Sequence, residues 1–342
     1  MPTNTRIILD TDPGIDDALA IFLALASPEV QLEAITTVSG NVHVDLTTRN
    51  ALSLLELAGR ADIPVARGCT RPLLRQPVEA AYVHGSNGLG EVELPTPRTS
   101  VVAQHATELI IEKILQAPGE ITLVAIGPLT NVALALRREP RIAQAVREVV
   151  IMGGALRVPG NTTPAAEFNI LADPHAAHMV FHGGWPIRLV SLDVTNRTPL
   201  HREQVVQLAH NGHVVTRCME QMIDYYFDVF TPAYGVTAFA MHDPLCLAAA
   251  FQPEWITWEP AYVDVELQGM LTLGETVAFF RNYSESASAP PNMQVSTGLM
   301  LKALSHGTWH GSPRPLARRE DHRVMKRTRW RRSCMPVSLF AV

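Results

Sequence analysis

The sequence predicts an α/β protein with a Rossmann-like, open and mostly parallel sheet, helices on both faces, and a single domain. Strand-like and helix-like segments alternate along the chain, which is the pattern of a parallel sheet with crossover helices. Several predicted strands end in Gly or Asp, so small and acidic residues gather at one edge of the sheet. With 342 residues, 47% of them hydrophobic and 18% charged, the chain can bury a large core.

The individual elements follow from local patterns. An apolar run at 6–9 predicts the first strand, and the Ala- and Leu-rich run at 18–26 is too long for a strand and predicts a helix. Residues 67–98 are rich in Pro and Gly and predict a long loop over the sheet edge. Further strands are expected at 32–38, 64–66, 121–126, 149–152, 187–192, 262–266, 276–280 and 293–296, and further helices at 44–57, 101–117, 201–230, 245–251 and 299–304.

Four carboxylates lie within eight positions between the first strand and the first helix. Residues 10–17 read DTDPGIDD, and in a parallel sheet such a turn lies at the carboxyl ends of the strands, where ligands bind. Crowded carboxylates raise one another's pKa values, so the turn is costly unless a cation neutralises it. Oxygen ligands without Cys or His favour a hard ion, and Ca²⁺ accepts irregular oxygen sets more readily than Mg²⁺.

Two details of this turn remain open from the residues alone. Because neighbouring side chains diverge, we expect only one of Asp16 and Asp17 to face the ion, with the other holding a group beside it. The alternative is that the Asp residues cap the helix on a solvated turn, which Asp does well.

Charge is unevenly distributed along the chain. Residues 305–342 hold nine Lys and Arg against two Asp and Glu, a net charge of +7, and residues 1–304 carry −12. The acidic body argues against nucleic acid as a partner. We therefore expect one folded domain at 1–304 and a poorly ordered basic tail at 305–342, with a nucleic-acid-binding arm as the alternative for the tail.

Other features indicate a cytoplasmic enzyme. A strand begins by residue 6, which leaves no room for a signal peptide, and no apolar run is long enough to span a membrane. The four Cys residues lack the spacing of metal ligands or of a disulfide framework.

The sequence resembles the inosine-uridine-preferring nucleoside hydrolase family, enzymes that cleave the N-glycosidic bond of ribonucleosides with Ca²⁺. The acidic turn carries the resemblance as DxDPGxDD, and distant segments match as well. These segments are SGN at 39–41, VHGxxGLG at 83–90, GPLTN at 127–131, MGG at 152–154, Asn161, EFN at 167–169 and HDP at 242–244. The family normally ends in a strand and a helix, whereas here the pattern dissolves after residue 304.

The resemblance implies a role for each matching residue. Asp12, Asp17 and Asp243 would ligate Ca²⁺ together with the backbone carbonyl of Ile126, where family members often have Thr. Asp12 would also be the general base that activates a metal-bound water, and Asp10 would support the loop without touching the ion. The substrate contacts would come from Asp16, Asn41, His84, Met152, Asn161, Glu167, Phe168, Asn169 and Tyr234.

The chemistry of glycosidic cleavage is consistent with these roles. The reaction passes through an oxocarbenium-like transition state, so it needs negative charge near the sugar and an activated water. Asp16, Asn41, Asn161, Glu167 and Asn169 would hold the ribose hydroxyls, and His242, beside Asp243, would protonate the leaving base. Alone, His84 could be an ordinary loop histidine and Tyr234 a core aromatic.

The resemblance also sets expectations for biology and leaves some alternatives. His84, Tyr234 and His242 together resemble members that act on pyrimidine nucleosides or on both inosine and uridine. We expect an enzyme of nucleoside catabolism and of purine and pyrimidine salvage, acting as a homodimer or homotetramer. The alternatives are a Mg²⁺-dependent aspartyl-nucleophile phosphohydrolase, which also places Asp-x-Asp after its first strand, and a nucleoside binder without catalytic activity.

Overall fold

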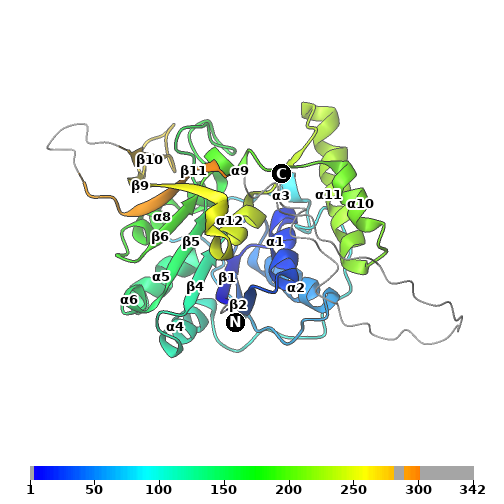
Figure 1. Cartoon of the computed structure of the whole chain (residues 1–342), viewed down its shortest axis with the longest axis horizontal. Helices are drawn as coiled ribbons and strands as arrows, with labels where there is room; N and C mark the ends of the chain where they lie inside the picture. The colour runs from blue at the N-terminus through cyan, green and yellow to red at the C-terminus, as the bar shows by residue number, and fades with distance from the viewer. Residues whose placement is uncertain (1–3, 281–288, 301–342) are drawn as a thin grey trace, which may run out of the picture.

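The computed structural model describes residues 4–280 and 289–300, and in these residues a nine-stranded sheet forms the centre of the fold (Figure 1). The strand order is β10-β9-β11-β6-β5-β4-β1-β2-β3. The strands are β1 (Thr5–Thr11), β2 (Val30–Thr37), β3 (Val65–Arg67), β4 (Ile121–Ala125), β5 (Glu148–Met152), β6 (Ile187–Val190), β9 (Ile256–Val265), β10 (Thr276–Phe279) and β11 (Met293–Leu299). Two short strands, β7 (Pro199–Leu200) and β8 (Phe239–Ala240), pair separately.

The direction of the strands places the site. In the spatial order of the sheet, the neighbouring strands β11-β6-β5-β4-β1-β2-β3 all pair in parallel. Strand β9 runs antiparallel to both β11 and β10. From β1 the chain first builds outward through β2 and β3 and then returns to β4 on the other side of β1. The carboxyl ends of β1 and β4 therefore flank the point at which strand order reverses, where ligands bind in open α/β sheets.

Helices cover both faces of the sheet, as predicted. One apolar core includes α1 (Ile15–Ala26), α2 (Val44–Leu57), α9 (Leu192–Thr195), α10 (Arg202–Ala209), α11 (Val214–Tyr234) and α12 (His242–Phe251). The core on the opposite face includes α4 (Ala106–Gln116), α5 (Thr130–Arg138), α6 (Ile142–Ala145), α7 (Phe168–Ala172) and α8 (Pro174–Phe181). Two short helical segments, α3 (Ala81–His84) and the 3₁₀ turn Pro253–Trp255, lie in connections.

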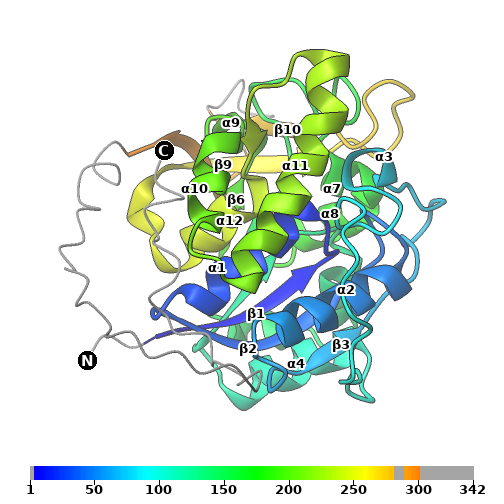
Figure 2. The same cartoon turned by 90° about the vertical axis from the view of Figure 1, so that its right-hand side faces the viewer.

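Helix α1 is buried along its whole length. All twelve residues are buried, and Figure 2 shows the helix lying between the sheet and α11. Its Ala and Leu content favours a helix that is apolar on every side, which is the expected pattern for a helix inside a core. The helix begins at Ile15, earlier than the predicted residue 18, because the carboxylate of Asp17 accepts the N–H of Gly14 (2.9 Å) and caps the first turn.

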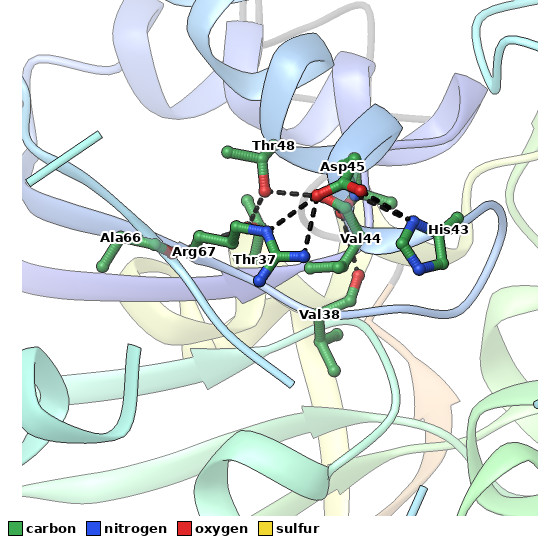
Figure 3. Close-up of polar contacts among 9 residues, drawn as sticks. Thr37, Val38, His43, Val44, Asp45, Thr48, Ala66 and Arg67 are labelled. Carbon is green, nitrogen blue, oxygen red and sulfur yellow. Dashed lines mark hydrogen bonds and ion pairs between the residues drawn. The ribbon is translucent and has the colours of Figure 1, made fainter. Parts of the chain in front are cut away.

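The start of α2 is fixed by polar contacts to neighbouring strands (Figure 3). The Thr48 hydroxyl lies 2.7 Å from that of Thr37 on β2, and the Arg67 guanidinium on β3 lies 2.7 Å from the Asp45 carboxylate. The Thr47 hydroxyl donates to the carbonyl of Val38 (3.0 Å). These contacts hold both ends of the loop at 38–43, which carries Asn41 into the site.

Several predicted boundaries are wrong for identifiable reasons. Residues 101–105 are not helical, because the ring of His105 accepts the Thr107 N–H and Glu108 reaches back to His105 N–H, which starts α4 at Ala106. The predicted strand at 187–192 ends at Val190, and Leu192 begins α9. The predicted loop at 67–98 contains α3, and Leu299 belongs to β11 rather than to a helix. The predicted helix at 301–304 and the tail at 305–342 lie outside the described residues.

Strand β11 lies inside the sheet although it is the last element described. It pairs in parallel with β6 and antiparallel with β9, so it joins the parallel body to the antiparallel edge. Within residues 4–280 and 289–300, no helix combines the length and the apolar character that crossing a membrane requires.

Candidate active site

The acidic turn after β1 is held by its own hydrogen bonds. Asp17 accepts hydrogen bonds from the Thr11 hydroxyl (2.5 Å), the Gly14 N–H (2.9 Å) and the Asn41 side chain (2.9 Å). A side chain at Gly14 would collide with this arrangement, because its Cβ would lie 2.7 Å from the Asn41 and His84 side chains. The Pro-Gly bend predicted from the sequence therefore lets the turn at 10–17 and the loop that carries Asn41 meet at the Asp17 carboxylate.

Asp12 is fully buried and only half satisfied. Its Oδ2 accepts the backbone N–H of Asn41 (2.7 Å), whereas its Oδ1 has no hydrogen-bond partner among the residues that the structure describes. Burial, and then the charge of Asp17, raise the pKa of Asp12 well above its ordinary value. A buried carboxylate oxygen without a partner is rare in a folded protein and indicates a missing positive ligand or proton.

Three further carboxylates converge beside it. Asp16 and Asp17 at the start of α1 and Asp243 at the start of α12 each bring an oxygen within 4.8 Å of the others. The expectation that only one of Asp16 and Asp17 faces this point is wrong in its strict form. Their Cβ atoms diverge, but oxygens two bonds further out can still approach a third carboxylate.

Burial dominates the electrostatics of this cluster. It raises the pKa of Asp16 to about 8, with the Asp17 charge as the next cause. The pKa of Asp243 is raised well above its ordinary value by burial and then by the charges of Asp16, Asp17 and Asp12. The cluster therefore favours the binding of positive charge.

Asp10 supports the turn from behind. Its Oδ1 accepts hydrogen bonds from the Thr36 hydroxyl (2.6 Å) and from the Asn131 amide (2.8 Å). Asn131 also donates to the carbonyl of Thr37 (2.9 Å) and accepts the Cys69 N–H (2.9 Å). One residue of the GPLTN segment thus joins the ends of β1, β2 and β3, and Asp10 does not line the cavity described below.

Polar side chains in the loop between β5 and α7 and at the start of α7 line the cavity described below. Glu167 caps α7 by accepting the N–H groups of Asn169 (2.9 Å) and Ile170 (3.1 Å). Asn161 accepts the N–H of Phe168 (3.0 Å). The Asn169 amide donates to the carbonyl of Ile126 at 2.9 Å, so it fixes a main-chain oxygen at the end of β4.

Two histidines, the buried His84 and the partly buried His242, line the same cavity. The Nδ1 of His84 accepts the N–H of Ile15 (3.0 Å), which leaves the proton of the neutral ring on Nε2. Burial lowers the pKa of His84 to about 3 and that of His242 to about 4. The Nδ1 of His242 lies 2.7 Å from the Thr195 hydroxyl, so α9 orients this ring.

These side chains line a cavity of about 270 Å³. It brings together Asp16, Asn41, His84, Ile126, Met152, Asn161, Glu167, Phe168, Asn169, His242 and Asp243 from the predicted residues. Asp10, Asp12 and Asp17 do not line it. Asp12 and Asp17 instead accept hydrogen bonds from Asn41, and Asp10 accepts hydrogen bonds from Thr36 and Asn131.

The structure does not bring Tyr234 to the cavity. Its side chain is 76% exposed at the end of α11, and two aromatic residues earlier in the same helix, Tyr226 and Phe230, line the cavity instead. Their rings stack at 4.7 Å, and Phe239 meets Tyr226 edge-on at 4.7 Å. Sequence reasoning missed this wall, although aromatic residues at 226, 230 and 234 share one helix face at a spacing of four.

The fold and the candidate site define an α/β protein that gathers buried carboxylates at the point of strand-order reversal. Residues 7–305 match the family described as inosine-uridine preferring nucleoside hydrolase. The chain is 45% identical over 282 residues to the inosine-uridine preferring nucleoside hydrolase of Crithidia fasciculata. The matched region covers 81% of this chain and 88% of the relative.

Solved structures agree. A plant nucleoside hydrolase superposes with a TM-score of 0.81 at 35% identity, covering 87% of this chain and 95% of that one. The purine-preferring ribonucleoside hydrolase of Gardnerella vaginalis gives 0.81 at 33% identity, with 86% and 93% covered. The chain belongs to the inosine-uridine preferring nucleoside hydrolase family and is a nucleoside hydrolase. This membership decides against the phosphohydrolase alternative.

Proposed function

We propose that this enzyme hydrolyses the N-glycosidic bond of ribonucleosides to a free base and ribose with the help of Ca²⁺. The observation that carries the proposal is the division of the cavity lining into two chemically different groups of side chains. One group consists of carboxylates and amides, and the other consists of Tyr226, Phe230 and Phe239, whose rings contact one another. A ribonucleoside has the same division, with a hydroxyl-rich sugar and a flat base that can stack on aromatic rings.

The residues fit a hard divalent cation. The unpartnered Oδ1 of Asp12 supplies an oxygen that needs a positive partner, and the nearby donors are oxygens of Asp17 and Asp243. The carbonyl of Ile126, already oriented by Asn169, would complete the predicted set. Asp16 also brings an oxygen into this cluster, so it would lie beside the ion as well as in the cavity. When bound, the ion would neutralise the crowded carboxylates and position the attacking water.

Asp12 would be the general base. Its Oδ2 is held by the Asn41 N–H, and its Oδ1 would take a proton from water. The ribose hydroxyls would be held by Asp16, Asn41, Asn161, Glu167 and Asn169, which line the cavity. Contacts of this kind accelerate the reaction when they strengthen as the sugar flattens toward the oxocarbenium-like transition state.

His242 would assist departure of the base. With a pKa lowered to about 4, its ring is neutral at pH 7, so it would act by donating a hydrogen bond or its ring proton to the base rather than as a preformed cation. His84, with its proton on Nε2, presents a second neutral donor to the cavity. Met152 and Phe168 would contact the nucleoside, whereas the exposed Tyr234 would need α11 to move before it could reach the base.

Base release under controlled metal content tests the proposal. The purified chain is incubated with inosine, uridine, cytidine and adenosine after chelation with EGTA and after addition of Ca²⁺ or Mg²⁺, and free base and ribose are quantified. We expect base and ribose in equal amounts, loss of activity on chelation, and recovery with Ca²⁺. The exposed-carboxylate variant Asp62→Asn serves as a control that should match the wild type.

Each failure has its own meaning. No base release from any nucleoside in the presence of Ca²⁺ would refute the hydrolytic function and leave the inactive binder, which would still bind nucleoside. Full turnover after chelation would refute the cation and leave the hydrolysis. The assembly as a homodimer or homotetramer and the cytoplasmic role in salvage remain predictions, and light scattering and fractionation of cells test them.

A further inference from the structure

A second group of metal-binding side chains lies outside the cavity. His178 on α8, His182 directly after it and Asp264 on β9 each offer one ligand atom, and these atoms lie within 4.8 Å of one another. None of the three lines the cavity or touches the acidic turn. Figure 1 shows α8 beside β9 at the antiparallel end of the sheet.

The two histidines share one face of the helix. Residues four apart are neighbours on a helical surface, and the two ring centroids are 4.6 Å apart. The Nδ1 of His178 lies 2.7 Å from Asp264 Oδ1, and the Nε2 of His182 lies 3.2 Å from the same oxygen. Both rings therefore already direct a nitrogen at one carboxylate.

Rigid elements hold these side chains in place. Helix α8 is capped by Asp173, whose Oδ1 accepts the N–H of Ala176 at 3.1 Å. Asp264 pairs with Val277 of β10, and its Oδ1 also accepts the N–H of Val265 at 2.8 Å. Ligands on a helix and a strand keep their relative positions better than ligands on loops.

The donor chemistry differs from that of the active site. Two imidazole nitrogens and one carboxylate oxygen, with no thiolate, suit a borderline transition-metal ion such as Zn²⁺, whereas the all-oxygen site suits a hard ion. The three side chains are 39%, 32% and 34% exposed, so an ion can enter from solvent and keep an open coordination position. Near these ligands, Tyr262 places its hydroxyl 3.5 Å from Asp264 Oδ2 and can orient that carboxylate.

We propose that His178, His182 and Asp264 form a binding site for a transition-metal ion of the Zn²⁺ type, separate from the active site. The ion replaces the direct imidazole–carboxylate hydrogen bonds and joins α8 to β9. Because it binds the folded chain, it stabilises the antiparallel end of the sheet. The site does not depend on the proposed function, since none of its ligands contacts the cavity.

Metal binding by the full chain tests this site. In excess Ca²⁺, Zn²⁺ binding is measured by competition with a chromophoric chelator for the wild type, His182→Ala and Asp264→Asn, so that any Zn²⁺ held at the active site is common to all three. We expect one more equivalent of Zn²⁺ in the wild type than in the variants, or an affinity at least roughly 10-fold higher. The matched control His210→Ala removes an exposed histidine elsewhere and should bind Zn²⁺ as the wild type does.

Two readouts separate this site from unspecific binding. Co²⁺ added to the Ca²⁺-loaded wild type should give the visible absorption of a low-coordinate nitrogen and oxygen site, and both variants should lose it. Zn²⁺ should raise the melting temperature of the wild type and of His210→Ala, but not that of the two variants. Equal Zn²⁺ stoichiometry and affinity in the wild type and the variants would overturn the proposal, as would a wild type that binds no Zn²⁺ at micromolar concentrations.

Discussion

The substitution Gly40→Ala tests whether the position of the Asp12 carboxylate controls activity. The Cβ of an alanine at this position would lie 2.0 Å from Asp12 Oδ2 and 2.8 Å from both Asp12 Cγ and Pro128 Cδ. Non-bonded contacts are favourable only beyond about 3.5 Å, so the carboxylate has to move by about 1 Å or more. Gly40 is not among the residues with positive φ, so backbone strain does not contribute.

The expected loss follows from this displacement. A misplacement of about 1 Å at a reacting group can cost roughly 100-fold in rate, or about 2.7 kcal/mol in the activation barrier. The shift would also weaken the hydrogen bond from the Asn41 N–H to Asp12. We therefore expect kcat/KM to fall by about 100-fold or more while the chain still folds.

Initial rates of base release from inosine and uridine give kcat/KM, and circular dichroism with thermal melting reports folding. Gly298→Ala is the matched control, because its Cβ would meet no atom closer than 3.5 Å. This control should retain wild-type rates. A folded Gly40→Ala enzyme whose kcat/KM stays within about threefold of the wild type would refute the assigned role of Asp12.

Three further variants probe the site and its protonation. Asp12→Ala should lower kcat by on the order of 10³-fold or more, since it removes both the proposed base and a proposed cation ligand, and a near-normal kcat in steady-state assays would contradict those roles. Asn169→Ala should lower kcat by roughly 10- to 100-fold, because the Ile126 carbonyl and the ribose lose one positioning group, and a change confined to KM would argue for uniform binding instead. The folded state keeps His84 neutral with a pKa of about 3 against 6.5, so its contribution to stability is complete above pH 6.5 and is lost as the pH falls toward 3. At pH 4.5 this loss is about 2–3 kcal/mol, so His84→Gln should reduce the acid sensitivity of urea unfolding between pH 6.5 and 4.5, and an identical pH slope would count against it.

The layered fold and most of the cavity residues could be predicted from the sequence. The strand, the bend and the helix around residues 10–17 are each predicted by adjacent residues. The position of this turn at the sheet edge therefore followed from local patterns. The parallel body followed from the alternation of elements. The sequence could not show whether Asp17 caps the helix or belongs to a carboxylate cluster. The structure gives it both positions, because the same carboxylate accepts the Gly14 N–H and lies in the cluster.

Long-range placement was the part that sequence reasoning could not reach. The antiparallel pairing of β9 with β11 and β10 depends on which edges remain free after the parallel strands have paired, and no local pattern specifies that. The aromatic wall was missed because helical spacing at 226, 230 and 234 does not say which turn of α11 faces the cavity. Tyr234 lies only one turn beyond Phe230, yet its side chain is 76% exposed.

The internal position of β11 affects how this protein can be made. Residues 293–299 fill the gap between β6 and β9, which are separated from each other by about 65 positions of chain. Before residues 293–299 have been synthesised, the edge of β6 that pairs with β11 has no partner strand. Strand β9 of the β9–β10 hairpin likewise lacks its pairing with β11. Completion of the sheet therefore awaits nearly all of the described chain, and unfinished chains expose strand edges that chaperones would have to shield.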